Sequence, residues 1–341
     1  MNRLAAVGAG PQISVVVPSR DRGHLLPRLV ESLAAQRGVE RYELIVVDDC
    51  STDETSDVLR DLSASMPDLL RPAHTTRPSG AATARNVGWR LAEAPIVAFT
   101  DDDCQPDASW LANLLARFGD VDVVQGATSF DAAKAAGRGP FSQVISVDHW
   151  TGQFETSNVA YRRDLLAELD GFDEGFEGDS FGEDVDLGWR ALERGARVAF
   201  APDAVVVHDV KRGPALHELA ASLRAGWRWR HIGKVIHDHP GYRPHRLQRD
   251  PFLAATHPPT QLALLGLLVL AAQGAGRSNH RLLRAAAVAA LLPWLRHRIV
   301  VEPRPGRWRH LPIVLPAAFA VDAAETLTVA ASGIRYRTLV L

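Results

Sequence analysis

The sequence predicts an α/β protein with a mostly parallel sheet covered by helices on both faces, followed by a C-terminal α-helical region. Strand-like and helix-like stretches alternate through residues 1–200, and two apolar strand-like runs end directly in aspartate clusters. This alternation favours parallel strands, because each crossover helix returns the chain to the same edge of the sheet. With 341 residues, 46 % of them hydrophobic, the chain is long enough for a full core or for two domains.

The individual elements follow from hydrophobic periodicity and from residues that begin or end regular structure. Strands are expected over 13–17, 42–47, 96–100, 121–125, 155–161, 197–200 and 205–208. Helices are expected over 25–36, 81–92, 107–118, 163–169, 183–194 and 214–236, with one more that residues 51–53 cap and that ends at 62. Residues 127–150 have no clear pattern, 171–182 read as a loop, and 238–259 read as an extended arm.

Charge divides the chain into two predicted domains. Residues 1–210 hold 19 Lys and Arg against 34 Asp and Glu, whereas residues 211–310 hold 17 against 4. We therefore expect one domain over 1–210 and a basic helical region over 211–341 that meets an anionic partner. Cys50 and Cys104 are too few for a disulfide framework, and the first 12 residues are too short for a signal peptide. Both observations predict a cytoplasmic protein.

Three apolar stretches near the C-terminus allow more than one interpretation. They cover 262–272, 285–295 and 311–331, and arginines flank the first two. The first two are shorter than the roughly 20 residues that a spanning helix needs, and the third contains Asp322 and Glu325. A small soluble helical subdomain and a set of helices lying in a membrane interface are the two main alternatives, and spanning helices are the third.

The aspartate clusters indicate a ligand site. Asp48 and Asp49 follow one apolar run, and Asp101, Asp102 and Asp103 follow another. Ligands of open α/β sheets bind outside the carboxyl ends of the strands, and carboxylates gathered there repel one another unless a cation lies between them. A divalent cation holding a diphosphate satisfies this requirement, because hard cations prefer oxygen ligands. Solvated loops and helix caps are the alternative explanation.

Four segments in this order and spacing resemble the family-2-like glycosyltransferases of the GT-A fold across about residues 12–210. They are SVVVPSRDR (14–22), ELIVVDDCSTDET (43–55), GAATARNVGWRLAEAPIVAFTDDDCQPDASWL (80–111) and ETSNVAYRRDLLAELDGFDEGFEGDSFGEDVDLGWRALERG (155–195). The resemblance implies a Rossmann-like GT-A domain over 1–210 that binds a nucleoside-diphosphate sugar. It also implies that the region 211–341 is an extension with an acceptor, membrane-interface or oligomer role.

The resemblance places the nucleotide base and ribose at the ends of the first two strands. The residues implicated are Pro18, Ser19, Arg20 and Asp49. A carboxylate accepts hydrogen bonds from a base N–H, which gives Asp49 a chemical reason to be there. Asp48 is the alternative to Asp49, although it is equally suited to capping the following turn.

The helix after the glycine turn carries two further donor-binding residues by resemblance. Arg85 would pair with a phosphate oxygen, which a guanidinium does well, and Asn86 would lie beside it. The alternative for Arg85 is a salt bridge to a neighbouring aspartate.

The triple aspartate matches the family's DxD motif, which implies a Mn²⁺ or Mg²⁺ cofactor. We expect Asp103 to be the metal ligand and Asp101 its helper, which meets ribose or a metal-bound water. Asp102 is a register alternative and a donor contact. His208, at the end of a predicted strand, would complete the metal site, and a purely structural role is its alternative.

Glu183 and Asp184 match the family's acidic pair at a helix start, and Asp184 would be the general base that deprotonates the acceptor hydroxyl. Acidic residues in a first helical turn also favour the helix dipole without any catalysis. The family's processive synthases carry a QxxRW motif that residues 227–230 do not match, so we expect transfer of single sugars.

Taken together, these features predict a cytoplasmic, metal-dependent glycosyltransferase that inverts the anomeric centre by in-line displacement. Its partners would be a nucleoside-diphosphate sugar, an acceptor hydroxyl on a lipid-linked or cell-envelope glycan, and the anionic inner face of the membrane, with no nucleic acid. Alternatives are a soluble enzyme that modifies a small metabolite or natural product, a retaining GT-A enzyme, and a non-catalytic sugar-nucleotide-binding or membrane-adaptor protein. A homodimer is a further option.

Overall fold

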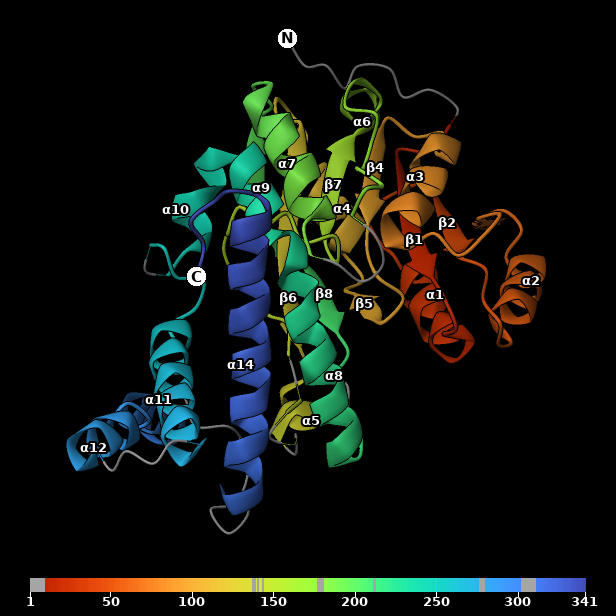
Figure 1. Ribbon diagram of the computed structural model, residues 1–341. Helices are drawn as coiled ribbons and strands as arrows, with labels where there is room; N and C mark the ends of the chain where they lie inside the picture. The colour runs from red at the N-terminus through yellow and green to blue at the C-terminus, as the bar shows by residue number, and fades with distance from the viewer. Residues whose placement is uncertain are drawn as a thin grey trace. The chain divides into compact units, whose positions relative to one another are not determined.

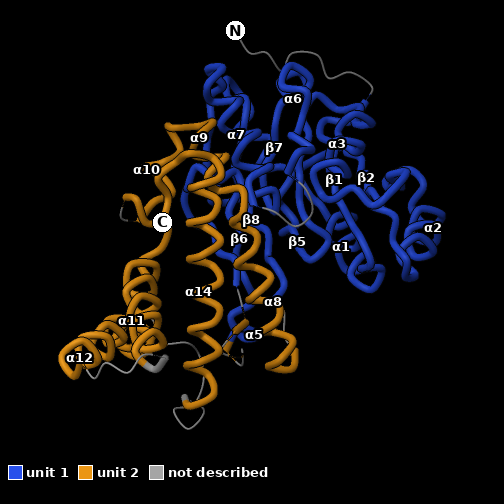
Figure 2. The backbone as a smooth tube through the Cα atoms, viewed as in Figure 1, with its two compact units in different colours: residues 1–135, 144–210 blue, residues 136–143, 211–341 orange. Residues whose placement is uncertain are grey.

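The chain forms two compact units in a computed structural model. The described residues are 10–136, 139, 141–142, 144–176, 181–210, 213–248, 250–275, 280–301 and 311–341. Unit 1 comprises residues 1–135 and 144–210, and unit 2 comprises residues 136–143 and 211–341 (Figure 2). A short internal segment thus belongs to the C-terminal unit.

Unit 1 is built on an eight-stranded sheet with the strand order β3-β2-β1-β4-β7-β6-β8-β5 (Figure 1). Its strands are β1 (Ile13–Ser19), β2 (Tyr42–Asp48), β3 (Leu70–His74), β4 (Ile96–Phe99), β5 (Cys104–Pro106), β6 (Val123–Phe130), β7 (Val159–Arg162) and β8 (Val198–His208). The central strands are fully buried and rich in β-branched residues, as expected for strands covered on both faces.

The sheet is mixed, with four parallel and three antiparallel pairings, in line with the expected mostly parallel sheet. β1 pairs in parallel with β2 and β4, β2 with β3, and β6 with β8. β7 runs antiparallel to both β4 and β6, and β5 runs antiparallel to β8. The α/β class and the C-terminal helices are confirmed. The parallel half brings the carboxyl ends of β1, β2 and β4 to one edge, where Ser19 is in register with Asp48.

The helices of unit 1 lie between these strands in the chain. They are α1 (Leu26–Ala34), α2 (Thr55–Ser65), α3 (Ala81–Leu91), α4 (Trp110–Leu115), α5 (Ala132–Ala136), α6 (Arg163–Glu168) and α7 (Glu183–Glu193), with a 3-10 turn η1 (Gly23–Leu25). Gly88 lets α3 lie directly on β1, since a Cβ there would come within 2.3 Å of Val16 Cγ1. This close approach fixes the position of the residues one turn earlier on α3.

Two strands have no clear sequence signal. β3 contains a proline and a histidine and lies at the sheet edge with three of its five residues exposed, so it lacks a continuous apolar run. β5 has only three residues. Conversely, the two strands expected over 197–200 and 205–208 are one strand, β8, whose pairing with β6 is irregular at Gly126.

Unit 2 is helical. Its elements are α8 (Ala215–Trp227), α9 (Ile232–Asp238), α10 (Arg243–Arg246), α11 (His257–Ala275), α12 (Arg281–Ala289), α13 (Leu292–Arg296) and α14 (Leu311–Arg335), with the short turns η2 (Arg228–His231), η3 (Pro240–Tyr242) and η4 (His297–Val301). The helix expected over 214–236 is therefore interrupted by η2, and the expected arm over 238–259 contains two short helical segments.

The core of unit 2 includes a buried ion pair. Phe141, Ala263, Trp294, Ala318 and Val321 form its apolar cluster. Beside them, Asp322 of α14 accepts hydrogen bonds from Trp294 Nε1 at 2.9 Å and from the Arg298 guanidinium. Among the described helices, residues Pro312–Arg335 alone are long and apolar enough to cross a membrane, with a mean hydropathy of 1.6 and a third of the most apolar window buried. Asp322 and its partners place a buried ion pair within this apolar segment.

Candidate active site

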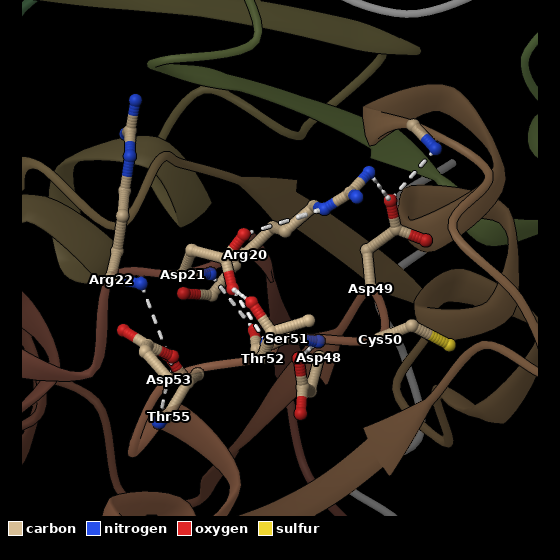
Figure 3. A network of polar contacts seen from close by, with 12 residues as sticks. Arg20, Asp21, Arg22, Asp48, Asp49, Cys50, Ser51, Thr52, Asp53 and Thr55 are labelled. Atoms are coloured by element: carbon tan, nitrogen blue, oxygen red, sulfur yellow. Dashed lines mark hydrogen bonds and ion pairs between the residues drawn. The ribbon is translucent and has the colours of Figure 1, made fainter.

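The loops after β1 and β2 are tied together by side-chain hydrogen bonds (Figure 3). Asp21 accepts hydrogen bonds from Thr52 N at 2.6 Å and Thr52 Oγ1 at 3.1 Å, and its own N–H donates to Ser51 Oγ at 2.9 Å. Asp21 has a φ of 52°, a left-handed conformation that aspartate tolerates better than most residues. Asp21 thus joins two loops and does not cap the helix that follows it.

Asp49 organises the glycine turn before α3. Its carboxylate accepts hydrogen bonds from Thr75 Oγ1 at 2.8 Å, Ser79 N at 2.9 Å and Gly80 N at 2.8 Å, and it is 3 % exposed. Arg20 extends toward it, with Nη1 3.8 Å from Asp49 Oδ2 (Figure 3). Gly80 has a φ of 89°, which favours glycine at this turn. The carboxylate predicted to meet a base is therefore already occupied by a structural turn.

Asp48 caps the turn after β2, the role offered as its alternative. It accepts from Ser51 N at 2.9 Å and from Ser56 Oγ. Pro18 is half-buried on β1, in register with Val47. Both residues thus lie at the strand edge where the donor site was predicted.

Asp102 is buried and held from two sides. Ser19 Oγ donates to it at 2.8 Å, and Arg22 Nη1 donates to its other oxygen at 2.7 Å. Burial raises the pKa of Asp102, and the Arg22 cation partly opposes that rise. This carboxylate therefore acts as an anchor for the Ser19 and Arg22 side chains.

Asp103, directly before β5, and His208, the last residue of β8, meet where these two strands pair. His208 Nε2 lies 3.3 Å from Asp103 Oδ1, while His208 Nδ1 lies 3.0 Å from the carbonyl oxygen of Asp209. With Nδ1 donating to that carbonyl, Nε2 keeps a lone pair directed at the carboxylate. Ligand atoms of Asp103, Cys104 and His208 lie within 4.8 Å of one another, and all three residues are buried.

The Asp103–His208 pair fits a divalent cation. A carboxylate oxygen and an imidazole nitrogen suit Mn²⁺, and Asp103 Oδ2 is oriented by Arg22 Nη1 at 3.1 Å. Cys104 fits less well, because burial raises the pKa of its thiol well above the usual range. Asp101, predicted as the helper, instead faces Arg85 and lies outside this group of three.

Arg85 joins the DxD segment to the start of α7. Its Nη2 donates to Asp101 Oδ1 at 2.9 Å, and its Nη1 donates to Glu183 Oε1 at 3.2 Å. The side chain is buried, and Nε has no hydrogen-bond partner. The structure thus shows the salt bridge that was the alternative to a phosphate contact.

All four hydrogen-bonding positions of the Asn86 side-chain amide are used within the protein. Its Nδ2 donates to Phe172 O at 2.9 Å and to Glu174 Oε1 at 2.8 Å. Its Oδ1 accepts from Trp89 Nε1 and Phe172 N, both at 2.9 Å. These four bonds hold the segment 172–174 against α3 and leave no capacity for a donor contact. Asn86 is therefore a positioning residue, contrary to the donor-binding role predicted from the resemblance.

The start of α7 presents Glu183 and Asp184. Gly182 precedes them with a φ of 132°, and Gly188 lets the helix press against Phe154, since a Cβ there would meet the ring at 2.1 Å. Burial, then the charges of Glu183 and Glu155, raise the pKa of Asp184 well above the usual range. A carboxylate with a raised pKa suits general-base work.

Asp186, the third acid of this turn, has a different role. Its Oδ2 accepts from Arg190 Nε at 2.7 Å, an i,i+4 pair along α7. Arg190 in turn donates to the carbonyl oxygens of Leu169 and Gly171. Favourable helix interactions therefore explain Asp186, whereas they do not account for the raised pKa of the half-buried Asp184.

Sequence reasoning missed two residues of this site. Arg22 forms ion pairs with Asp102 and Asp103, and the charge of Glu155 raises the pKa of Asp184. Arg22 and Glu155 lie in the quoted motif segments 14–22 and 155–195, but no spacing rule links them to their partners.

Comparison with known proteins supports the motif assignment. Residues 14–168 match the model of Glycosyl transferase family 2. The chain is 33 % identical over 212 residues to a pre-mycofactocin glycosyltransferase of Mycobacterium tuberculosis. The matched region covers 58 % of this chain and 42 % of that protein. It is 29 % identical over 225 residues to a validoxylamine A glucosyltransferase of Streptomyces hygroscopicus subsp. jinggangensis, covering 54 % and 52 %. The chain thus spans about half the length of these curated relatives.

A solved structure shares the fold. A mannosyltransferase from Pyrobaculum calidifontis, in complex with GDP-Man and Mn²⁺, superposes with a TM-score of 0.61 at 22 % identity, covering 93 % of this chain and 87 % of that one. The four motifs, the mixed sheet and these likenesses together show a GT-A fold in unit 1, whose residues 14–168 match Glycosyl transferase family 2.

Proposed function

We propose that the chain transfers a single sugar from a nucleoside-diphosphate donor to an acceptor hydroxyl, with a divalent cation and with inversion. The observation that carries this proposal is the convergence of three groups in unit 1. Asp103 and His208 would form a cation-binding pair, Arg85 links the DxD segment to Glu183 of α7, and Asp184, next to Glu183, has a raised pKa.

The donor would lie at the edge formed by the ends of β1, β2 and β4. Arg20 and Asp101 lie at this edge by their place after β1 and β4, and Asp49 holds the glycine turn beside them. The mannosyltransferase with the same fold was solved with GDP-Man and Mn²⁺, which supports a nucleotide sugar and a divalent metal for this chain as well. When bound by Asp103 and His208, a divalent cation would offset the negative charge of the diphosphate leaving group.

In the transfer step, Asp184 would take the proton of the acceptor hydroxyl. The acceptor oxygen would form a bond to the anomeric carbon, while the bond from that carbon to the diphosphate oxygen breaks and the nucleoside diphosphate leaves with the electron pair. In-line geometry inverts the anomeric centre. A retaining enzyme would use the same donor site, and anomeric analysis of the product separates the two.

The acceptor class divides into two candidates. A lipid-linked or cell-envelope glycan fits the basic unit 2 and a peripheral location on the inner face of the membrane. A small metabolite is the second candidate, because the name of one relative specifies validoxylamine A as its substrate.

The experiment that tests the donor site is a thermal-shift panel of UDP, GDP, dTDP and CDP, each with and without Mn²⁺. The proposal expects one nucleotide to stabilise the protein strongly, and only with metal. If no nucleotide shifts the melting temperature, the aspartate clusters are structural and the proposal fails. Donor turnover by wild type but not by Asp184→Asn, with equal donor binding, separates an enzyme from a binding protein.

A further inference from the structure

Unit 2 exposes apolar side chains on one pair of packed helices. On α11, Leu262, Leu265 and Leu268 recur every third residue and lie 43, 60 and 66 % exposed. On α12, Leu282 and Val288 are 88 and 52 % exposed. α11 is apolar around its whole circumference, which is unusual for a helix in contact with water. These side chains need a cover that the described chain does not supply.

The two helices form one element. Gly266 of α11 lies against α12 so closely that a Cβ would come within 2.5 Å of the Ala287 carbonyl oxygen. Arg284 Nε of α12 also donates to Gln273 Oε1 of α11 at 3.2 Å. Figure 1 shows the pair side by side within unit 2. The exposed leucines of both helices are therefore held in a fixed relation to one another.

The charge around this pair has one sign. Residues 251–301 contain five arginines and no aspartate, glutamate or lysine. Of these, Arg281, Arg284 and Arg296 are exposed, Arg298 pairs with Asp322, and Arg277 lies outside the described residues. An exposed apolar surface with cationic side chains at its border matches an anionic lipid surface, where leucines enter the acyl boundary and arginines meet phosphates.

We propose that the exposed face of α11, α12 and the adjoining α13 binds an anionic phospholipid bilayer from one side. Its apolar contacts are Leu265, Leu268, Leu282 and Val288, and its cationic contacts are Arg281 of α12 and Arg296 of α13. A second copy of the chain fits this face less well. In a two-fold interface the same surface of both copies meets, so the arginines of one copy would face those of the other. Residues 251–301 contain no acidic side chain that could form ion pairs with these arginines. This inference concerns unit 2 and does not require the transfer reaction.

The test is co-sedimentation of the full chain with vesicles of phosphatidylcholine, with and without phosphatidylglycerol, at low and high salt. We expect sedimentation with the anionic vesicles that weakens as salt rises. Leu282→Glu should reduce the partition coefficient by about tenfold or more, because one buried leucine changes a binding constant by roughly that factor. Arg281→Gln with Arg296→Gln should reduce the preference for anionic over neutral vesicles.

The matched control is Leu216→Glu on α8 of the same unit, where the leucine is 79 % exposed but lies outside the proposed face. It should sediment as wild type does, and melting curves should show all variants folded. The inference is overturned if wild type sediments with neither vesicle, or if Leu216→Glu loses as much binding as Leu282→Glu. It is also overturned if light scattering shows a dimer that Leu282→Glu dissociates while vesicles bind neither protein. Donor binding by the thermal-shift panel is read separately, so failure of either idea leaves the other intact.

Discussion

His208 Nε2 lies 3.3 Å from Asp103 Oδ1, although the histidine ends β8 and the aspartate follows β4. The second oxygen of the same carboxylate accepts a hydrogen bond from Arg22 Nη1 at 3.1 Å. One side of Asp103 thus faces the His208 imidazole and the other the Arg22 guanidinium. The orientation of the proposed metal ligand therefore depends on both neighbours.

Removing either member of this pair should weaken metal binding. Asp103→Asn and His208→Ala should each lower Mn²⁺ affinity in the presence of the preferred nucleotide by about 10–100-fold or more. Calorimetric titration measures this directly. Asp148→Asn, at a carboxylate whose side chain is 85 % exposed, is the control and should titrate as wild type does. Unchanged affinity in His208→Ala would mean that the histidine is only structural.

Arg22 should oppose metal binding while it stabilises the fold. Arg22→Met removes a positive charge 3.1 Å from Asp103, so Mn²⁺ affinity without nucleotide should rise. It also leaves buried Asp102 without its cation, which should lower the free energy of unfolding by about 1–3 kcal/mol. Denaturant unfolding and Mn²⁺ titration measure the two effects.

Arg20→Met is the matched control for Arg22→Met. The Arg20 side chain is 46 % exposed, and its nearest carboxylate oxygens lie 3.8 Å away. Its loss should change the free energy of unfolding by less than about 1 kcal/mol. Equal effects from the two substitutions would contradict the role given to Arg22.

Asp184→Asn should lower the activity and raise the stability of the protein. Loss of a general base should lower kcat by about 10²–10⁴-fold while donor binding is kept. The folded pKa of Asp184 is raised above its unfolded value, so the folded state binds this proton more tightly. Stability from this group is greatest at acidic pH and falls as the pH rises toward the raised pKa. A neutral asparagine removes that loss, so at neutral pH the variant should melt at a higher temperature than wild type. A lower melting temperature would argue against a strained carboxylate.

Glu155 should set the acid limb of the pH–rate profile. Its charge contributes to the raised pKa of Asp184, after burial and Glu183. Glu155→Gln should lower the pKa of Asp184, so activity should persist to lower pH than in wild type. The profile of kcat/KM against pH checks this. A limb that does not move, or that moves to higher pH, would exclude electrostatic control of the base by Glu155.

Local patterns in the sequence were enough to predict most elements of unit 1. β1, β2 and β4 are continuous apolar runs, and α3 and α7 begin at glycine turns, so pattern and position agree. β3 and β5 were missed because a sheet-edge strand with a proline and a three-residue strand take their pairing from neighbours, not from their own composition. The helix expected over 214–236 is likewise interrupted at η2, where the sequence contains no proline or pair of glycines that would predict the break.

By itself, the sequence determined the fold class and the positions of the acidic motifs, because strand-end aspartates and glycine turns are encoded by neighbouring residues. Only the tertiary structure decided how the charges are shared. Arg85 pairs with Asp101 and Glu183, and Arg22 pairs with Asp102 and Asp103. Asn86 forms its side-chain hydrogen bonds with the segment that follows α6. Such pairings join residues that are distant in the chain. They form because an unpaired buried charge or amide costs free energy, and this cost arises only after the sheet and helices have brought the groups together.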